Sequence, residues 1–239
     1  MLEFLPECHS TNEEVLLRIR RKVLNEGYIL HTGHQIAGKG QRGNAWLSEP
    51  GKNLLFSIYL TPKMLLPKQA FLLNIISGLA VVDALSPAIS DTVELKWPND
   101  VYVGDRKISG ILVETMIEGG VIVDAVVGIG VNVNQSYFSL TSATSMLMES
   151  GSTHDLEELL EQIVLQMEKY YLKLKSGDAK GIIDAYYKVM RWRGEIHSFQ
   201  DKEGIFEGEI IGVDDTGRLT VKTNNTVRSF DVKEIAFLY

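Results

Sequence analysis

Two segments of the sequence hold residues that could bind and activate an anion. In residues 33–43, four glycines are interspersed with Lys39 and Arg42. Backbone N–H groups in a glycine-rich loop, together with two cations, are suited to enclose a phosphate or a carboxylate. The spacing is close to that of a phosphate-binding P-loop, but Gly40 stands where that motif has Ser or Thr, and such a glycine-rich run cannot begin a good helix. We therefore predict a flexible anion-binding loop anchored by Trp46; a mobile surface loop is the alternative.

The second segment is the run Lys-Trp-Pro-Asn-Asp at residues 96–100, followed by a strand-like run at 107–117. The proline in the first run predicts a rigid turn that presents Asp100. Lys107 begins the second run, next to Ser109 and Gly110. A solvated charged hairpin is the alternative, which composition alone does not exclude.

A third feature is the run of residues 121–134, in which every odd position up to Val133 is apolar. The even positions include Gly128, Gly130 and Asn132. A strand with one apolar face and a glycine-rich opposite face lets another backbone or a ligand approach closely. An ordinary bulged strand is equally compatible with this spacing.

Hydrophobic periodicity predicts the elements that must position these residues. We expect helices at 10–26, 68–85, 155–174 and 180–191, and strands at 28–32, 53–60, 93–97, 107–117 and 121–133. The first helix begins with a capping-box pattern from Ser10 to Glu13. After Arg193, short alternating strands separated by turns predict a small antiparallel barrel or sheet, which is too small to fold alone. We therefore expect a main domain at 1–190 and a small C-terminal β domain at 191–239.

Length and composition are those of an ordinary globular protein, with 239 residues of which 45% are hydrophobic and 23% charged. A net charge of −7 argues against broad nucleic-acid binding, which needs a basic surface. Residues 31–64 nevertheless carry four basic residues against one acid, a local balance of +3, which favours a small anionic ligand. The single cysteine, Cys8, fits a reducing compartment, and we find no signal peptide, no run of roughly 18 apolar residues and no metal-ligand spacing among the five histidines. We expect a cytoplasmic protein that does not span a membrane.

Five segments, in order, resemble the signature of the biotin–protein ligases. They are Ser10-Thr11-Asn12, Gln35, the loop at 38–46, the run from 96 to 114, and the Gly-x-Gly-x-Asn strand at 128–132. The resemblance covers nearly the whole chain. It implies an α+β fold, with a mixed, mostly antiparallel sheet, flanking helices and a small C-terminal SH3-like β-barrel. It also implies an ATP-dependent enzyme that activates biotin as biotinyl-5′-AMP and transfers it to a lysine of a biotin carboxyl carrier protein.

The resemblance assigns roles to the matching residues. Ser10, Thr11, Asn12 and Gln35 should surround the ureido ring of biotin. Lys107 and Lys39 should act in catalysis on the biotin carboxylate and the adenylate phosphate, and Asp100 should lie near the nucleotide and its Mg²⁺. The other residues implied to bind biotin or the adenylate are Gly38, Gly40, Gln41, Arg42, Trp46, Gly110 and Asn132.

The sequence departs from the family pattern in two respects. Gln41 stands where the family loop usually has its second arginine, so Arg42 is the candidate replacement for that charge. The match begins at residue 10, so we expect a monofunctional form without the DNA-binding domain of some members. We therefore expect no nucleic-acid partner. The resemblance also admits a homodimer. The alternatives are a lipoate- or octanoate-protein ligase of the same fold, against which the polar residues 10–12 favour a ureido ring, and a non-enzymatic biotin-binding module.

Overall fold

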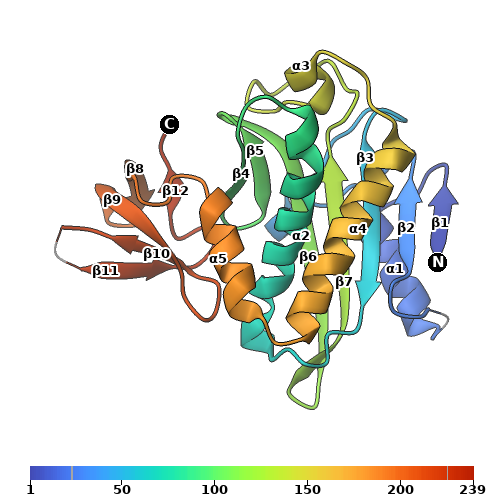
Figure 1. The fold of residues 1–239 in the computed structure, drawn as a ribbon, viewed down its shortest axis with the longest axis horizontal. Coiled ribbons are helices and arrows are strands. Elements are labelled where there is room, and N and C mark those ends of the chain that lie inside the picture. The colour runs from blue at the N-terminus through green and yellow to red at the C-terminus, as the bar shows by residue number, and fades with distance from the viewer. Residues whose placement is uncertain (23, 225) are drawn as a thin grey trace.

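A seven-stranded sheet forms the framework of the fold (Figure 1). The computed structural model describes residues 1–22, 24–224 and 226–239, and the side chain of Arg42 lies outside the description. The strand order is β1-β2-β3-β7-β6-β5-β4, antiparallel except between β1 and β2. The strands are β1 (Leu2–Leu5), β2 (Ile29–Thr32), β3 (Leu54–Leu60), β4 (Val93–Lys96), β5 (Asp100–Val103), β6 (Arg106–Glu118) and β7 (Val121–Val131). The expected mixed, mostly antiparallel sheet is confirmed.

The central strand β7 separates an apolar face from a glycine-bearing face. Ala125, Val127 and Ile129 join the main hydrophobic core, whereas Val126 packs into a smaller cluster. Because side chains alternate along a strand, Gly128 and Gly130 share the face of Val126. The alternation expected from the sequence therefore holds, and the glycines lie where a neighbouring group can approach the sheet.

Three helices cover the apolar face of the sheet: α2 (Phe71–Leu85), α4 (Leu156–Lys175) and α5 (Ala179–Val189). Helix α2 is apolar on nearly all sides because it lies between the sheet and α4. The segment Pro67–Ala88, which contains α2, is long and apolar enough by length and composition to cross a membrane, although it includes the charged residues Lys68 and Asp83. However, 67% of its most apolar window is buried inside the structure, as befits a core helix.

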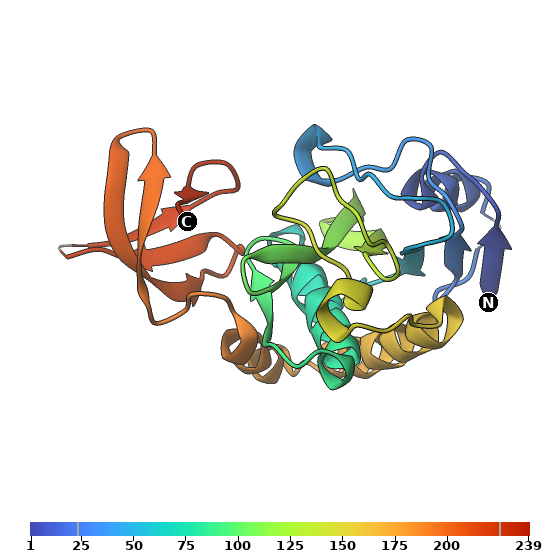
Figure 2. The ribbon, with the colours of Figure 1, turned by 90° about the horizontal axis from the view of Figure 1, so that it is seen from above.

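The opposite face carries the segments singled out in the sequence. Figure 2 shows the helices α2 and α4 on one side of the sheet, and the glycine-rich segment and the loop at 134–145 on the other. Helix α1 (Thr11–Arg20) also lies on this second side, where Val15 packs against Tyr59 and Val126. The apolar face thus supplies the core, and the glycine-bearing face is left for the site.

Helix α1 differs from its sequence-based prediction at both ends. Ser10 stands at the N-cap position with extended backbone, but its side chain makes no capping hydrogen bond, so the expected capping box is absent. The helix ends at Arg20 rather than near residue 26, and Lys22 has a φ of 57°, a left-handed conformation that does not continue a helix. The sequence analysis also missed β1 and the short helix α3 (Met146–Ser150).

The C-terminal segment forms a separate five-stranded antiparallel sheet, visible at the left of Figure 2. Its order is β11-β10-β9-β8-β12, from the strands β8 (Ile196–Asp201), β9 (Gly204–Val213), β10 (Leu219–Lys222), β11 (Val227–Phe230) and β12 (Ala236–Phe237). This arrangement is consistent with an SH3-like module. The indole N–H of Trp97 donates to the carbonyl of Gly217 at 2.9 Å, which ties the second sheet to the turn after β4.

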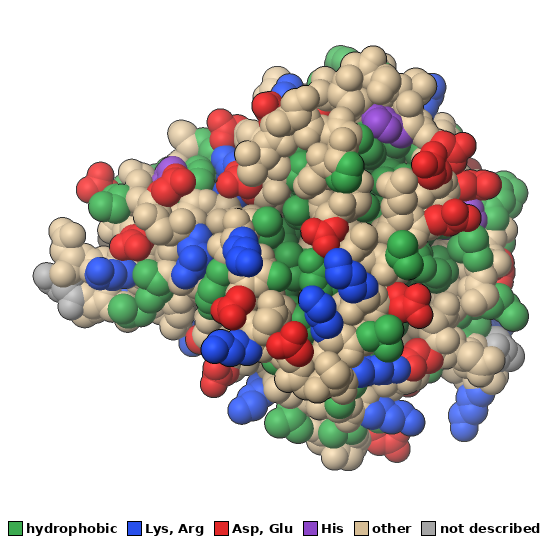
Figure 3. Space-filling view, viewed as in Figure 1, with side chains coloured by type: hydrophobic (Ala, Val, Ile, Leu, Met, Phe, Trp, Pro, Cys, Tyr) green, Lys and Arg blue, Asp and Glu red, His purple; other side chains and the backbone are tan. Residues whose placement is uncertain are grey.

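Charged side chains of both signs share the surface over the helices. Figure 3 shows Lys and Arg side chains interspersed with Asp and Glu on this face. Lys175 and Glu26, for example, form an ion pair at 2.8 Å. The intermixing differs from the continuous basic patch that marks a nucleic-acid-binding face.

Glu26 links the chain after α1 to the end of α4. Its carboxylate accepts hydrogen bonds from Tyr171 Oη at 2.7 Å and from the Thr61 N–H at 3.0 Å, besides its contact with Lys175. Partial burial opposes ionisation, but the hydrogen bonds from Lys175, Tyr171 and Thr61 outweigh it and lower the pKa of Glu26 from 4.5 to about 2. A carboxylate with a depressed pKa stabilises the fold above its unfolded pKa and loses that effect as it protonates.

We expect Glu26→Gln to lower the free energy of unfolding at pH 7 by about 1 kcal/mol, a value reduced for the partial exposure of the ion pair. The difference between wild type and variant should shrink as the pH falls from about 4.5 to about 2, because protonated Glu26 resembles glutamine. Urea denaturation across this pH range measures both effects. Glu168→Gln, at an exposed position on α4, is the control, and a difference that does not depend on pH would contradict the assignment.

Candidate active site

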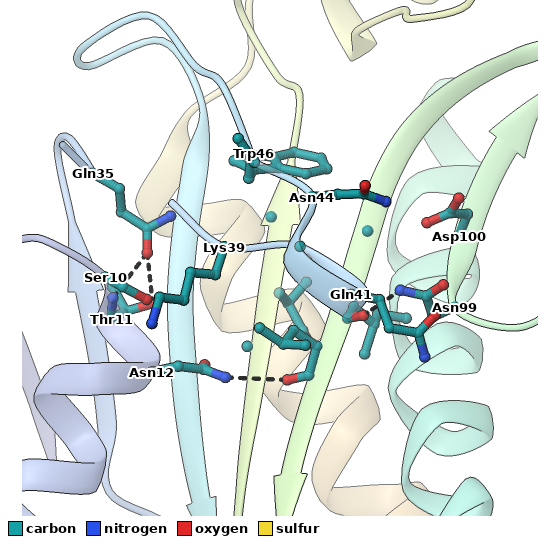
Figure 4. Close-up of a pocket in the computed structure, with 18 of the residues that line it drawn as sticks. Ser10, Thr11, Asn12, Gln35, Lys39, Gln41, Asn44, Trp46, Asn99 and Asp100 are labelled. Atoms are coloured by element: carbon teal, nitrogen blue, oxygen red, sulfur yellow. Dashed lines mark hydrogen bonds between the residues drawn. The ribbon is translucent and has the colours of Figure 1, made fainter. Parts of the chain in front are cut away.

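A pocket of about 240 Å³ opens on the glycine-bearing face of the sheet, between α1 and the turn after β4 (Figure 4). Its walls come from the start of α1, the glycine-rich segment through Trp46, Phe56 of β3, the turn before β5, and the strands β6 and β7. Eleven of the residues expected to bind or react line it: Ser10, Thr11, Asn12, Gln35, Lys39, Gly40, Gln41, Trp46, Asp100, Lys107 and Gly110. The fold therefore brings distant sequence segments together around one cavity.

One end of the pocket is a network of four neutral polar side chains, those of Thr11, Asn12, Gln35 and Ser57, which is backed by the carboxylate of Glu114. Gln35 Oε1 accepts from the Thr11 N–H at 2.8 Å and from Thr11 Oγ1 at 3.2 Å. Ser57 Oγ lies 2.7 Å from Thr11 Oγ1 and 2.6 Å from Asn12 Oδ1. Asn12 Nδ2 donates to Glu114 Oε2 at 2.8 Å, so both ends of its amide are fixed. A rigid set of donors and acceptors of this kind suits a ligand with N–H and C=O groups.

Glycines form the floor of the pocket because larger residues would not fit. A Cβ on Gly128 would lie 2.3 Å from Asn12 Oδ1, and one on Gly130 would lie 2.7 Å from the indole of Trp46. Gly110 pairs with Gly130 across β6 and β7, and a Cβ there would meet Trp46 at 2.9 Å. The close approach expected at these glycines is thus made by side chains of the pocket, Asn12 and Trp46.

The other end of the pocket carries a lysine–carboxylate pair. Lys107 Nζ lies 2.6 Å from Asp100 Oδ1, and both side chains are partly exposed to the cavity. The turn that presents Asp100 is held by Asn99, whose Nδ2 donates to the carbonyl of Ile111 at 2.7 Å and whose carbonyl accepts from the Ile111 N–H at 2.9 Å. The expected turn thus presents Asp100 directly to Lys107.

The glycine-rich segment is folded as a tight turn beside the pocket. A short 3₁₀ helix spans Gln41–Gly43, and the N–H of Gly40 donates to the carbonyl of Asn44 at 2.7 Å. Lys39 forms an ion pair with Glu13 of α1, and this hydrogen bond raises the pKa of Lys39. Both lysines of the site are therefore paired with a carboxylate, so an anionic ligand has to compete with Glu13 and Asp100 for them.

A second hollow of about 210 Å³ adjoins the first and shares Ala45, Trp46 and Lys107 with it. Asn132 lies here rather than in the main pocket; its Nδ2 donates to the carbonyl of Thr144 at 2.9 Å, while its buried Oδ1 has no partner. The rest of the lining is mainly apolar and comes from Leu47, Gln135, Phe138, Ser139, Leu140 and Ala143. An apolar slot with one unsatisfied acceptor suits a flat ring that carries an N–H donor.

A further candidate, Gly38, is not among the described residues that line either cavity. Gly38 packs beneath Trp46, where a Cβ would lie 2.5 Å from the Trp46 carbonyl oxygen, so it has a structural role. The Arg42 side chain lies outside the described residues, and its replacement of a family arginine stays a prediction.

Three functional residues escaped the sequence analysis: Ser57, Glu114 and Glu13 as the partner of Lys39. Ser57 did leave a signal, because it is a small polar residue within the otherwise hydrophobic run of β3. Among the described residues, no group of three or more His, Cys, Asp or Glu side chains is placed to hold a metal ion.

Comparison with known proteins connects these features to a family. The model of the biotin/lipoate A/B protein ligase family matches residues 5–132. The biotin–[acetyl-CoA-carboxylase] ligase of Paracoccus denitrificans is 29% identical over 232 residues, which are 91% of this chain and 92% of that protein. The bifunctional ligase/repressor BirA of Bacillus subtilis (strain 168) is 28% identical over 208 residues, or 85% of this chain, and the match spans only 64% of its length.

Solved structures show the same similarity over the whole chain. The biotin protein ligase from Aquifex aeolicus, in complex with biotin and ATP, superposes with a TM-score of 0.81 at 28% identity and covers 98% of this chain and 97% of that one. The biotin protein ligase from Leishmania major, in complex with biotinyl-5-AMP, has a TM-score of 0.64, but at 22% identity it supports the fold alone.

Proposed function

The chain belongs to the biotin/lipoate A/B protein ligase family, and on that premise we propose that it is an ATP-dependent biotin–protein ligase. The observation that carries the proposal is a single pocket with a rigid neutral polar network at one end and the Lys107–Asp100 pair at the other. Biotin has the same polarity, with a ureido ring at one end and a carboxylate at the other. The similarity to ligases named for biotin supports the same choice of substrate.

The proposed reaction has two steps, and neither needs a nucleophile from the protein. A biotin carboxylate oxygen attacks the α-phosphorus of ATP, and pyrophosphate leaves, which gives biotinyl-5′-adenylate. A lysine amine of a biotin carboxyl carrier protein then attacks the acyl carbon, loses a proton, and releases AMP. Since two anions must meet in the first step, the work of the enzyme is positioning and charge neutralisation.

Each end of the pocket has a defined part in this scheme. Thr11, Asn12 and Gln35 hold the ureido ring, and Trp46 with the glycine floor confines the rest of biotin. The ammonium of Lys107 stands where the carboxylate and the α-phosphate converge, because it borders both cavities. Lys39 offers a second cation once it leaves Glu13.

The second hollow is the proposed site of the nucleotide base. The apolar walls can stack an adenine, and the unsatisfied Oδ1 of Asn132 can accept a hydrogen bond from its amino group. Mg²⁺ would enter with the ATP phosphates, since it favours one or two carboxylates plus phosphate oxygens, and Asp100 is the carboxylate placed to hold it. When bound, the ion neutralises charge on the phosphates.

The assay that tests the proposal uses the purified chain with ATP, Mg²⁺, biotin and a biotin-carrier domain, followed by intact mass of the carrier. We expect the carrier to gain the mass of one biotinyl group, because the pocket can both activate and deliver the acyl group. A parallel reaction with lipoate tests the alternative within the family, a lipoate–protein ligase. We expect lipoate to react poorly, because its acyl chain would leave the polar groups at the end of the pocket without hydrogen-bond partners. A carrier that stays unmodified and an ATP that releases no pyrophosphate would instead indicate a non-enzymatic biotin-binding module.

We propose a cytoplasmic location on the sequence evidence given above, with no membrane or nucleic-acid partner. A homodimer remains a prediction, and light scattering of the purified chain measures it.

The ion pair between Glu13 and Lys39 gives a prediction about affinity. We expect Glu13→Gln to tighten binding of biotinyl-adenylate about two- to fivefold. The Glu13 carboxylate competes with the anionic ligand for Lys39, and a surface ion pair of this kind contributes only a small free energy. Calorimetric titration with a non-hydrolysable adenylate analogue measures the change. Glu14→Gln is the matched control, since Glu14 pairs with Arg18 at 2.6 Å on the same helix. Weaker binding in Glu13→Gln would show that Glu13 holds Lys39 in its working position.

A further inference from the structure

We infer that Arg106 and Glu149 form a positioning pair for the nucleotide half of the reaction. The inference rests on the proposed function, since it takes the second hollow as the site of ATP. Neither side chain lines that hollow or the biotin pocket, so the pair acts through the segment that it holds.

Glu149 is a buried carboxylate with two partners. It lies on α3, is only 5% exposed, and accepts from Arg106 Nη2 at 2.9 Å through Oε1 and 3.0 Å through Oε2. Thr144 Oγ1 donates to the same Oε1. Burial of a carboxylate is costly unless charge and hydrogen bonds compensate its desolvation. The contacts with Arg106 and Thr144 supply that compensation for Glu149.

The partner of Glu149, Thr144, is bonded to the strand that carries Lys107. The N–H of Thr144 donates to the Lys107 carbonyl at 2.9 Å, and the N–H of Lys107 donates to the Ser142 carbonyl at 2.8 Å. The carbonyl of Thr144 accepts from Asn132 Nδ2 at 2.9 Å, which fixes the amide whose Oδ1 has no partner. Residues 142–144 thus brace Lys107 from its backbone and Asn132 from its side chain.

The ion pair between Arg106 and Glu149 connects the start of β6 to α3. Arg106 directly precedes Lys107 at the start of β6, and its contact with Glu149 draws α3 and Thr144 onto that strand. The apolar wall of the second hollow comes from residues that precede Thr144 in the chain, namely Phe138, Leu140 and Ala143. Removing the pair should therefore loosen the nucleotide side of the site and leave the ureido network at the other end of the pocket unchanged.

The test compares Glu149→Gln with wild type by pyrophosphate release, with ATP and biotin varied in turn. Glutamine keeps the shape and a hydrogen bond to Thr144 but loses the charge-assisted contact with Arg106. We expect the KM for ATP to rise about three- to tenfold, and the KM for biotin to stay within about twofold. Arg106→Met should reproduce this split, and Arg106→Lys, which keeps the charge, should restore part of it.

The control is Glu234→Gln, which breaks the ion pair of Arg218 and Glu234 at 3.3 Å in the second sheet and should change neither KM. Hydrogen exchange gives a readout besides activity: the amides of Lys107 and Thr144 should exchange faster in Glu149→Gln. An unchanged KM for ATP, an equal rise in both KM values, or unchanged exchange at these two amides would overturn the inference. Activity with lipoate in place of biotin would contradict the proposed function. The KM for ATP of Glu149→Gln and of wild type would then be compared with lipoate as the acyl substrate, and this comparison would still test the role of the pair.

Discussion

Substitution of Lys107 by alanine should lower the rate of biotin-dependent pyrophosphate release about 10²- to 10³-fold, the usual effect of removing one preorganised charge contact from a reacting centre. Lys107 is the cation that borders both cavities, and its ammonium is already fixed 2.6 Å from Asp100 and over the ring of Trp46. In the substrate complex it would neutralise the carboxylate and the phosphate as they approach each other. Initial rates at saturating ATP and biotin measure this loss.

The Lys107→Ala variant should stay folded, because its side chain is partly exposed and its backbone hydrogen bonds do not depend on the ammonium. Thermal denaturation checks this point. Lys169→Ala, which removes an exposed lysine of α4, is the matched control and should react at the wild-type rate. Pyrophosphate release by Lys107→Ala within a few-fold of wild type would remove Lys107 from the reaction.

Substitution of Gly128 by alanine should weaken biotin binding about ten- to hundredfold. The added Cβ would lie 2.3 Å from Asn12 Oδ1, and Asn12 cannot withdraw without breaking its contacts with Ser57 and Glu114. The displaced amide costs the ligand one or two hydrogen bonds in a buried site, which accounts for the size of the effect. Calorimetric titration with biotin measures it.

Overpacking alone would also destabilise the fold, so two further variants separate stability from recognition. Gly78→Ala places a Cβ 2.7 Å from Leu95 on the helical face of the sheet, and it should lower the melting temperature but leave biotin affinity unchanged. Asn12→Ala combined with Gly128→Ala should recover stability without recovering affinity, because the clash is gone but the amide is missing. Equal losses of affinity in the Gly78 and Gly128 variants would show that strain, and not the displaced Asn12, weakens binding.

The sequence alone predicted most of the elements and most of the residues that line the pocket. The period-two pattern of residues 121–133 predicted which face of β7 joins the core, since alternation is a local property of any strand. The apolar run at 68–85 predicted a buried helix for the same kind of reason. The local sequence also singled out Lys107 and Asp100, and the resemblance to the family signature added Ser10, Thr11 and Asn12, because these motifs are contiguous.

Tertiary structure decided how these residues are paired. Lys39 contacts Glu13, 26 positions earlier in the chain, and Ser57 contacts Asn12, 45 positions earlier. No local period encodes such contacts, because they arise from how α1 packs against the glycine-rich segment and against β3. The sequence likewise could not show that Ser10 leaves its helix uncapped, since an N-cap pattern fixes residue types but not side-chain rotamers.

The division between the two cavities is also a tertiary result. Gly130 and Asn132 are two residues apart at the end of one strand, yet Gly130 underlies Trp46 in the main pocket and Asn132 lies in the second hollow. The separation follows from Trp46, which packs against Gly110 and Gly130 and stands as the wall between the two spaces. Residue types and spacing thus predicted which residues line the cavities, whereas the packing of one indole on two glycines decided how the two cavities are divided. That contact depends on the approach of three segments that are distant in sequence.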